Sequence, residues 1–207
     1  MLSVHGRKPA AVFVEPVAKL AIAAGLTPNM VTVIGAIVTT AIAVVLIPAG
    51  FLFWAAVLSG AFAAFDMIDG TMARLKGGAS KFGATLDATC DRITDGALFA
   101  AITWWLIYDY DAPKVLVVAS FIVLVSSQVI SYVKARGEAS GLKMVGGLIE
   151  RPERLIISLV GVGLQGLGVP YAIDVAIWIL AAGSLFTVYQ RIALARRLDA
   201  RERKAAA

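Results

Sequence analysis

Long apolar stretches alternate with short polar segments along this chain. Six of the stretches are long enough to cross a bilayer as helices, because a transmembrane helix needs about 20 predominantly apolar residues. We expect the membrane spans at about 29–48, 51–75, 80–108, 114–135, 152–168 and 171–195. The pattern therefore predicts an all-α integral membrane protein that forms a single domain over residues 1–207.

The segment before the first span has a different pattern. Residues 7–24 are apolar, but charged side chains interrupt them and Pro16 breaks the run. Such a segment fits an amphipathic helix lying in the membrane interface better than it fits a span. Thr27 and Pro28 then supply an N-cap and a first-turn proline for the first span.

Composition and charge set the cellular context. With 59% hydrophobic residues, the chain is too apolar for a soluble domain. Nearly all lysines and arginines lie in segments that six spans place on one membrane side: the N-terminal segment, the 75–81 and 136–151 loops and the C-terminal tail. The positive-inside rule then predicts a multi-pass protein of the cell membrane with both termini in the cytoplasm. The net charge of +5 therefore does not imply a nucleic-acid partner.

Four aspartates occur inside this strongly apolar sequence, near the predicted cytoplasmic ends of the second and third spans. Asp66 and Asp69 are three residues apart, and Asp87 and Asp91 are four apart, so each pair projects from one helix face. Because a short loop joins the two spans, the carboxylates can meet. Oxygen-only ligands suit Mg²⁺ or Mn²⁺ rather than zinc, and four carboxylates favour two ions.

A second interpretation of the aspartates does not involve an enzyme. Intramembrane carboxylates also relay protons or cations in small membrane carriers. A carrier usually shows internal repeats or helices broken at the membrane midplane, and neither is clear here. The acids also gather on one side of the membrane, which favours a binding site over a relay.

The spacing of these residues resembles the signature of the CDP-alcohol phosphatidyltransferase family. That signature is D-x-x-D-G-x-x-A-R, followed after a short spacer by G-x-x-x-D-x-x-x-D. All eight positions are filled here within residues 66–91, by Asp66, Asp69, Gly70, Ala73, Arg74, Gly83, Asp87 and Asp91.

The resemblance implies a reaction and a set of roles. An alcohol attacks the lipid-linked phosphorus of a CDP-linked lipid, most often CDP-diacylglycerol, and CMP leaves. Asp91 is the implied general base, and the implied metal ligands are Asp66, Asp69, Asp87 and Asp91. The implied CDP-lipid residues are Asp66, Asp69, Gly70, Ala73, Arg74 and Gly83. Membrane lipids and a second copy of the chain, in a homodimer, are the other implied partners.

Three further polar residues flank this motif, each with two interpretations. Asn29 and Thr32 belong to a P-N-x-x-T stretch that looks like a family element near the nucleotide. They also fit a helix cap with a buried hydroxyl. Ser80 is a candidate phosphate contact, although the capping of the third span explains it more simply.

Basic residues near the cytoplasmic ends of the fourth, fifth and sixth spans are candidates for an acceptor-phosphate site: Lys134, Arg136, Arg151, Arg154 and Arg191. A helix N-terminus also favours an anion. The positive-inside rule for cytoplasmic loops explains any single one of these charges equally well. Lys134 and Arg154 are best placed, because each lies within one turn of its span.

The acceptor itself is inferred from two short stretches. LDATCDRITDG and RPERL look like actinobacterial members of the family whose acceptor is inositol 1-phosphate. The same chemistry with glycerol 3-phosphate is the alternative. In the first stretch, Asp95 continues the four-residue steps of Asp87 and Asp91 and lies three residues after Arg92. We expect Arg92 and Asp95 to form an ion pair within the helix.

Overall fold

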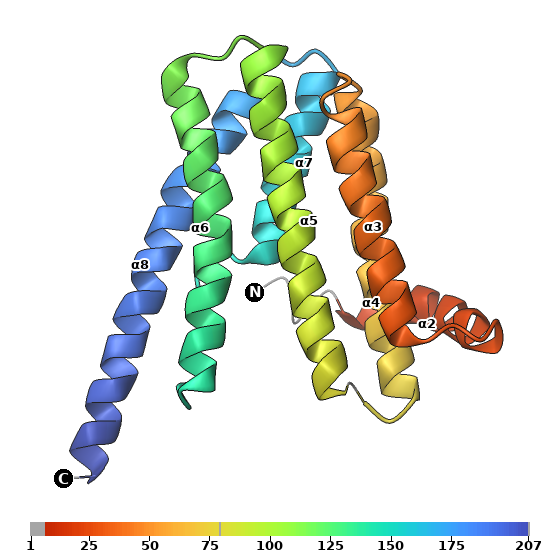
Figure 1. Ribbon diagram of the computed structural model, residues 1–207, viewed down its shortest axis with the longest axis vertical. Helices are drawn as coiled ribbons and strands as arrows, with labels where there is room; N and C mark the ends of the chain where they lie inside the picture. Colours follow the sequence, from red (N-terminus) through yellow and green to blue (C-terminus); the bar gives the residue numbers. More distant parts are fainter. Residues whose placement is uncertain (1–6, 79, 207) are drawn as a thin grey trace.

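The structure is a computed structural model that describes residues 7–78 and 80–206. The side chains it describes are those of residues 14–63, 67–78 and 80–204. Every regular element in the described part of the chain is a helix, as Figure 1 shows. The helices are α2 (Arg7–Ala23), α3 (Pro28–Leu46), α4 (Leu52–Leu75), α5 (Lys81–Tyr108), α6 (Lys114–Ala139), α7 (Arg151–Gly166) and α8 (Ala172–Ala206).

The helix starts follow the capping signals in the sequence. Thr27 accepts a 3.2 Å hydrogen bond from the Met30 amide, and Pro28 opens α3. Ser80 accepts a 2.9 Å bond from the Gly83 amide at the start of α5, which confirms its predicted role as a cap. The last helix differs from the expectation, because α8 continues past the predicted end near 195 as far as Ala206.

By length and composition, four of the helices in the described residues are able to cross a membrane, namely α3, α4, α6 and α8. Helix α5 carries a stripe of acids along its first half, and α7 has only 16 residues. The prediction of six spans with an interfacial N-terminal helix is therefore confirmed only in its coarser part, an all-helical chain with several apolar helices.

Helix α7 is the short central element of the bundle, packed between α4 and α8. Glycines on α7 permit its close packing against the neighbouring helices. A Cβ on Gly166 would lie 2.3 Å from the backbone nitrogen of Phe53, and one on Gly161 would lie 2.4 Å from the Cβ of Ala176. The tight packing fixes the depth at which α7 begins.

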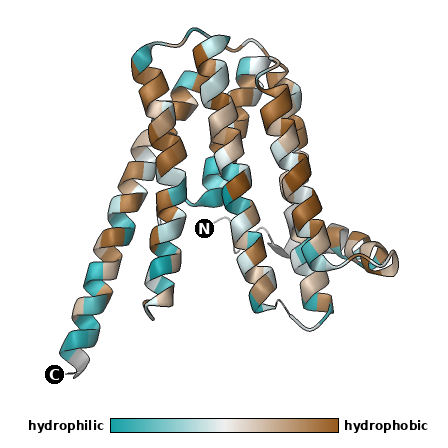
Figure 2. Ribbon diagram, in the orientation of Figure 1, coloured by the Kyte–Doolittle hydropathy of each residue, from teal (hydrophilic) through white to brown (hydrophobic). Residues whose placement is uncertain are grey.

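A polar cavity lies beside the start of α7, and we call this region the polar hollow. From a rise of 1.5 Å per residue, α7 is about 24 Å long and α5 about 42 Å. Both helices reach the same end of the bundle, so α7 begins part-way along it (Figure 1). Figure 2 shows hydrophilic residues gathered at the start of α7, inside the bundle. Arg191 anchors the preceding loop, donating to the Gly146 carbonyl at 3.4 Å and to Glu150 at 3.2 Å.

A long-range polar contact lies at the opposite end of the bundle. The Tyr110 hydroxyl donates a 2.8 Å hydrogen bond to Asp174 at the start of α8. Burial, and after it the bond and the charge of Asp174, raise the pKa of Tyr110 to about 12. This pair joins the turn between α5 and α6 to α8, far from the polar hollow at the start of α7.

Candidate active site

The ends of α4 and α5 bring two of the predicted aspartates to the edge of one cavity. Asp69, from α4, is only 7% exposed and accepts a hydrogen bond from the Thr32 hydroxyl of α3. Asp87, from α5, lines the same cavity as Asp69 and Thr32. Thr32 therefore holds one carboxylate of the motif and also lines the cavity. Its contact with the nucleotide stays a prediction.

This cavity lies between α3, α4 and α5 and has a volume of about 360 Å³. We call it the α3–α5 cavity. Most of the residues predicted to bind the CDP-lipid line it: Asn29, Thr32, Asp69, Gly70, Ala73, Ser80 and Gly83. Gly83 is needed for space, because a Cβ there would lie 3.1 Å from both the Asn29 side-chain oxygen and the Ser80 hydroxyl.

Two members of the predicted set are not among those lining residues. The Arg74 side chain is exposed and donates a 2.8 Å hydrogen bond to the Thr71 hydroxyl on its own helix. Asp66 belongs to α4, but its side chain lies outside the described residues. Their roles at the site therefore stay predictions from the motif.

A second and larger cavity, of about 780 Å³, opens between α5, α6, α7 and α8. We call it the α5–α8 cavity. It contains four of the five basic residues predicted for the acceptor: Lys134, Arg151, Arg154 and Arg191. Arg136 is exposed and is not among the residues that line it. Arg92 also lines the cavity, and four acids, Asp87, Asp91, Glu138 and Glu150, offset most of this positive charge. The lining therefore keeps a small positive excess, and the start of α7 contributes Arg151 and Arg154 to it.

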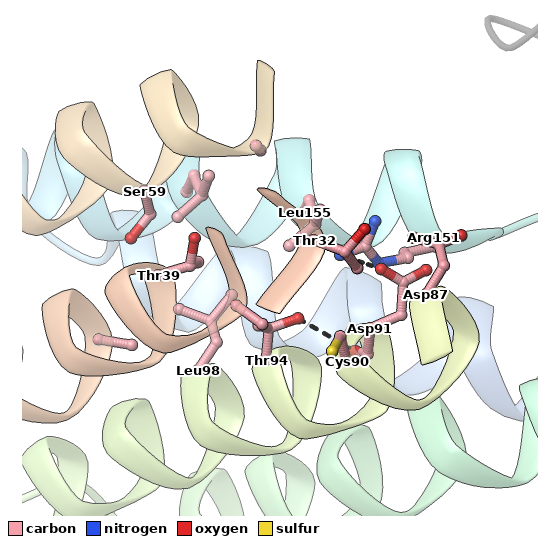
Figure 3. Close-up of a pocket in the computed structure, with 14 residues that line it drawn as sticks. Thr32, Thr39, Ser59, Asp87, Cys90, Asp91, Thr94, Leu98, Arg151 and Leu155 are labelled. Atoms are coloured by element: carbon pink, nitrogen blue, oxygen red, sulfur yellow. Dashed lines mark hydrogen bonds and ion pairs between the residues drawn. The ribbon is translucent and has the colours of Figure 1, made fainter. Parts of the chain in front are cut away.

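Asp87 and Asp91 stand where these spaces meet. Asp87 lines both cavities, and both aspartates line a narrow internal cavity that continues into the bundle between α3, α4, α5 and α7 (Figure 3). Asp91 accepts a 2.9 Å ion-pair contact from Arg151, and its side chain is 22% exposed. A group bound in either cavity is therefore within reach of the second aspartate pair.

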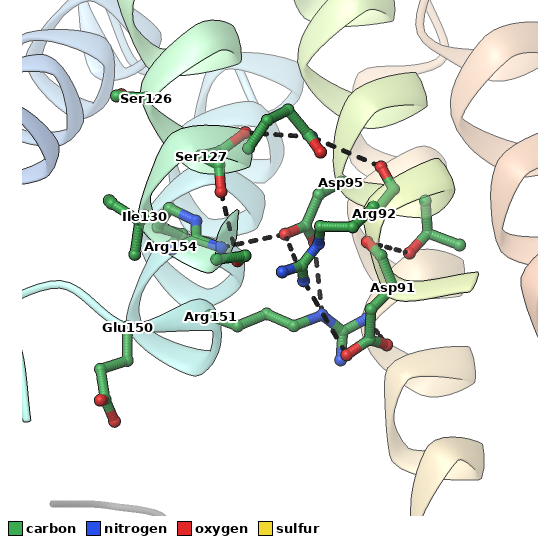
Figure 4. Close-up of polar contacts among 12 residues, drawn as sticks. Asp91, Arg92, Asp95, Ser126, Ser127, Ile130, Glu150, Arg151 and Arg154 are labelled. Carbon is green, nitrogen blue, oxygen red and sulfur yellow. Dashed lines mark hydrogen bonds and ion pairs between the residues drawn. The ribbon is translucent and has the colours of Figure 1, made fainter. Parts of the chain in front are cut away.

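Asp95 is the most buried acid of the site, with 1% exposure. Its Oδ2 accepts from Arg154 at 3.0 Å and from Arg92 at 3.3 Å, and its Oδ1 accepts from Arg151 at 3.4 Å (Figure 4). The predicted Arg92–Asp95 ion pair is confirmed. The two contacts with α7 were not predicted, although the four-residue steps on α5 were the signal that Asp95 faces the site.

Other polar lining residues were also missed by the sequence interpretation. From α6 they include Gln128, Ser131 and Tyr132, which read as ordinary span residues. Glu150 precedes α7 and forms a capping box with Glu153. The usual signature has a serine or threonine at the N-cap, so the sequence did not point to this one. Glu150 also pairs with Arg191 at 3.2 Å, so the cap of α7 and the basic cavity are linked.

The donor set suits a hard divalent cation. The cavity-lining aspartates offer only oxygen ligands, which Mg²⁺ and Mn²⁺ prefer. Asp69 and Asp87 border one cavity, and Asp91 follows Asp87 by one turn of α5. Among the described side chains, no group of three acidic, histidine or cysteine residues is close enough to form a metal centre. The predicted fourth ligand, Asp66, lies outside that set.

Comparison with protein families gives one match that covers most of the chain. The family described as CDP-alcohol phosphatidyltransferase matches residues 25–190. A phosphatidylinositol phosphate synthase of Corynebacterium glutamicum is 71% identical over 195 residues, which is 94% of this chain and 89% of that protein. One of Mycolicibacterium smegmatis is 54% identical over 181 residues, 86% of this chain and 81% of the relative.

Solved structures that are similar to this chain include those of another phosphatidylinositol phosphate synthase. The phosphatidylinositol phosphate synthase of Mycobacterium tuberculosis with CDP-DAG bound superposes with a TM-score of 0.85 at 48% identity, covering 88% of this chain and 92% of that one. The same enzyme in complex with manganese and citrate gives a TM-score of 0.85 at 48% identity, covering 88% of each chain. Both the helical arrangement and the sequence of this chain are therefore similar to theirs.

Proposed function

This chain belongs to the CDP-alcohol phosphatidyltransferase family, and we propose that it transfers the phosphatidyl group of CDP-diacylglycerol to inositol 1-phosphate. The products are phosphatidylinositol phosphate and CMP. One observation carries the proposal: two cavities meet at Asp87. Most residues of the predicted CDP-lipid site line one of them, and five basic residues line the other. The relatives named phosphatidylinositol phosphate synthase support the same reaction.

The donor occupies the α3–α5 cavity. Gly70, Ala73 and Gly83 present small surfaces there, which leave room for the cytidine diphosphate. Asn29 and Thr32 contact the nucleotide from α3, and Ser80 does so from the end of the loop. Arg74 completes this set by its place in the motif. The lipid chains of the donor remain in the bilayer.

Divalent ions bind between the two cavities. Asp66, Asp69, Asp87 and Asp91 hold them, as two Mg²⁺ ions with Mn²⁺ as a substitute. Bound there, the ions neutralise the diphosphate and stabilise the leaving phosphate. Thr32 contributes by fixing the carboxylate of Asp69. The structure of the M. tuberculosis relative in complex with manganese and citrate supports the use of a divalent metal.

Asp91 acts as the general base on the acceptor. It borders the basic α5–α8 cavity, where the acceptor binds with its phosphate against Lys134, Arg151, Arg154 and Arg191. The acceptor hydroxyl loses its proton to Asp91, and its oxygen bonds to the lipid-linked phosphorus. The bond from that phosphorus to the bridging diphosphate oxygen breaks, and CMP leaves with the electron pair. Proximity compensates for the weak basicity of a carboxylate beside cations.

The membrane arrangement is part of the proposal. Helices α3 to α8 form six spans of one domain, α2 lies in the interface, and the protein is a homodimer. Both termini and the two cavities face the cytoplasm, where nucleotides and sugar phosphates are present. The supporting observation is that α2, the loop between α4 and α5, and the ends of α6 and α8 lie at one end of the bundle (Figure 1).

The first test separates an enzyme from a membrane carrier. Purified protein in detergent with Mg²⁺, CDP-diacylglycerol and inositol 1-phosphate is expected to release CMP in proportion to lipid product. A chelator should stop the release, and added Mg²⁺ or Mn²⁺ should restore it, because the aspartates alone cannot neutralise the diphosphate. The matched control omits the acceptor. Absence of CMP under all metal conditions would remove the transferase proposal and favour the carrier.

A further inference from the structure

Asp95 carries a buried charge that neither the family motif nor the proposed reaction uses. Acids are almost never fully buried unless they are paired. Asp95 is 1% exposed and has three guanidinium partners, from Arg92, Arg151 and Arg154. Two of these partners come from α7, a different helix, so the pairing is set by how α5 and α7 pack.

The geometry separates Asp95 from the aspartates of the motif. It follows Asp91 by one turn of α5, so both side chains face α7, but Asp95 lies deeper in the bundle. Arg151 spans the two acids, with Nη2 at 2.9 Å from Asp91 and Nε at 3.4 Å from Asp95. Figure 4 shows this arrangement, with Asp95 between Arg92 and the α7 arginines.

The contact with Asp95 satisfies only part of the Arg154 guanidinium. It is 1% exposed and donates from Nη2 to Asp95 at 3.0 Å. Its Nε and Nη1 are buried and have no hydrogen-bond partner among the described residues, although the side chain lines the α5–α8 cavity. A buried donor without a partner destabilises the folded protein. Because Arg154 also lines the α5–α8 cavity, a phosphate bound there would meet this incompletely satisfied guanidinium.

A guanidinium is planar and rigid, so fixing one nitrogen orients the other two. Asp95 engages only one of the three nitrogens of Arg154. The carboxylate also offsets the mutual repulsion of three arginines, which would otherwise spread apart. With Asp91, the cluster of three arginines and two aspartates keeps a formal charge of +1 (+3 − 2).

We propose that Asp95 is a positioning residue that orients Arg154 and Arg151 toward the phosphate of the acceptor. It touches neither substrate. It acts through the two arginines and thereby makes the enzyme select a phosphorylated acceptor over a neutral one. This inference rests on the proposed function, because it requires the α5–α8 cavity to be the acceptor site.

The test is a kinetic comparison with Asp95→Asn, which keeps the side-chain shape and removes the charge. The apparent KM for inositol 1-phosphate is expected to rise about 10- to 100-fold, as for misaligned charge-assisted hydrogen bonds. The KM for CDP-diacylglycerol should stay within about twofold, because the α3–α5 cavity is untouched. The effect should not add to that of Arg154→Lys in the double variant, since both act on one contact.

Tyr110→Phe provides the matched control for a purely structural effect. It removes a long-range hydrogen bond at the other end of the bundle. It is expected to lower the melting temperature without changing either KM. If Asp95→Asn likewise lowers stability and leaves the acceptor KM unchanged, the positioning role is wrong.

Two further outcomes are distinguishable. If Asp95→Asn does not fold, Asp95→Glu keeps the charge but displaces the carboxylate by one methylene, and it should still raise the acceptor KM. An unchanged KM in that variant would assign Asp95 to folding alone and overturn the inference. If the unsubstituted protein neither binds nor turns over inositol 1-phosphate, the proposed function fails, and the positioning role of Asp95 fails with it.

Discussion

Asp91→Asn is expected to lower turnover by about 10²- to 10⁴-fold, the usual contribution of a general base. An amide cannot accept the proton of the acceptor hydroxyl at neutral pH, and it is also a poorer metal ligand. The fold should persist, because Arg151 keeps its contact with Asp95. The measurement is CMP release from CDP-diacylglycerol and inositol 1-phosphate, together with equilibrium binding of the CDP-lipid, which should remain detectable.

Asp174→Asn is the control for Asp91→Asn. Asp174 is a partly buried carboxylate bonded to Tyr110, away from both cavities. The same change of acid to amide there should leave turnover near that of the unsubstituted protein. Near-normal turnover in Asp91→Asn would remove Asp91 as the base, whereas an equal loss in both variants would point to a general effect on folding.

Arg154→Ala is expected to raise the apparent KM for inositol 1-phosphate by roughly 100-fold. Charge-assisted hydrogen bonds contribute about 1.5–3 kcal/mol each, and about 1.4 kcal/mol corresponds to a factor of ten. Two lost bonds at the lower end of that range give a change of this size. The measurement is initial rate against acceptor concentration at saturating CDP-diacylglycerol. The KM for CDP-diacylglycerol should change little, because Arg154 does not line the α3–α5 cavity.

Two variants make the result for Arg154 interpretable. Removal of Arg154 also leaves Asp95 with fewer partners, which costs stability. Arg154→Lys keeps the charge without the planar fork, so it should fold and show an intermediate KM. Arg201→Ala removes an exposed arginine from the end of α8 and should have no effect. A rise in the KM of the CDP-lipid alone would mean that the acceptor pocket is misplaced.

The helices were predictable from the sequence because their signals are local. Apolar runs and caps such as Thr27 and Ser80 define where α3 and α5 begin. The depth of α7 was not predictable, because it depends on close contacts such as that of Gly166 with Phe53. As a result, Arg154 read equally well as a topology charge, whereas the structure places it fully inside the bundle.

The candidate site was also predictable only in part. The motif fixes which residues of α3, α4 and α5 meet, and the structure brings Asn29, Asp69, Gly83 and Asp87 to one cavity. The contacts of Asp95 with two arginines of α7 required the packing of helices more than 50 residues apart. Arg136 is exposed and does not line the α5–α8 cavity, whereas Lys134 does. Residues two apart on a helix do not share a face, so helix periodicity could have separated these two.

The most direct test of the account is acceptor choice. Purified protein with Mg²⁺ and CDP-diacylglycerol is given inositol 1-phosphate, inositol or glycerol 3-phosphate, and CMP release is measured for each. The basic α5–α8 cavity predicts turnover with inositol 1-phosphate and little with free inositol. Turnover with glycerol 3-phosphate instead would keep the metal site and change the acceptor. Equal turnover with free inositol would contradict the central claim, because Lys134, Arg151 and Arg154 would then not recognise a phosphate.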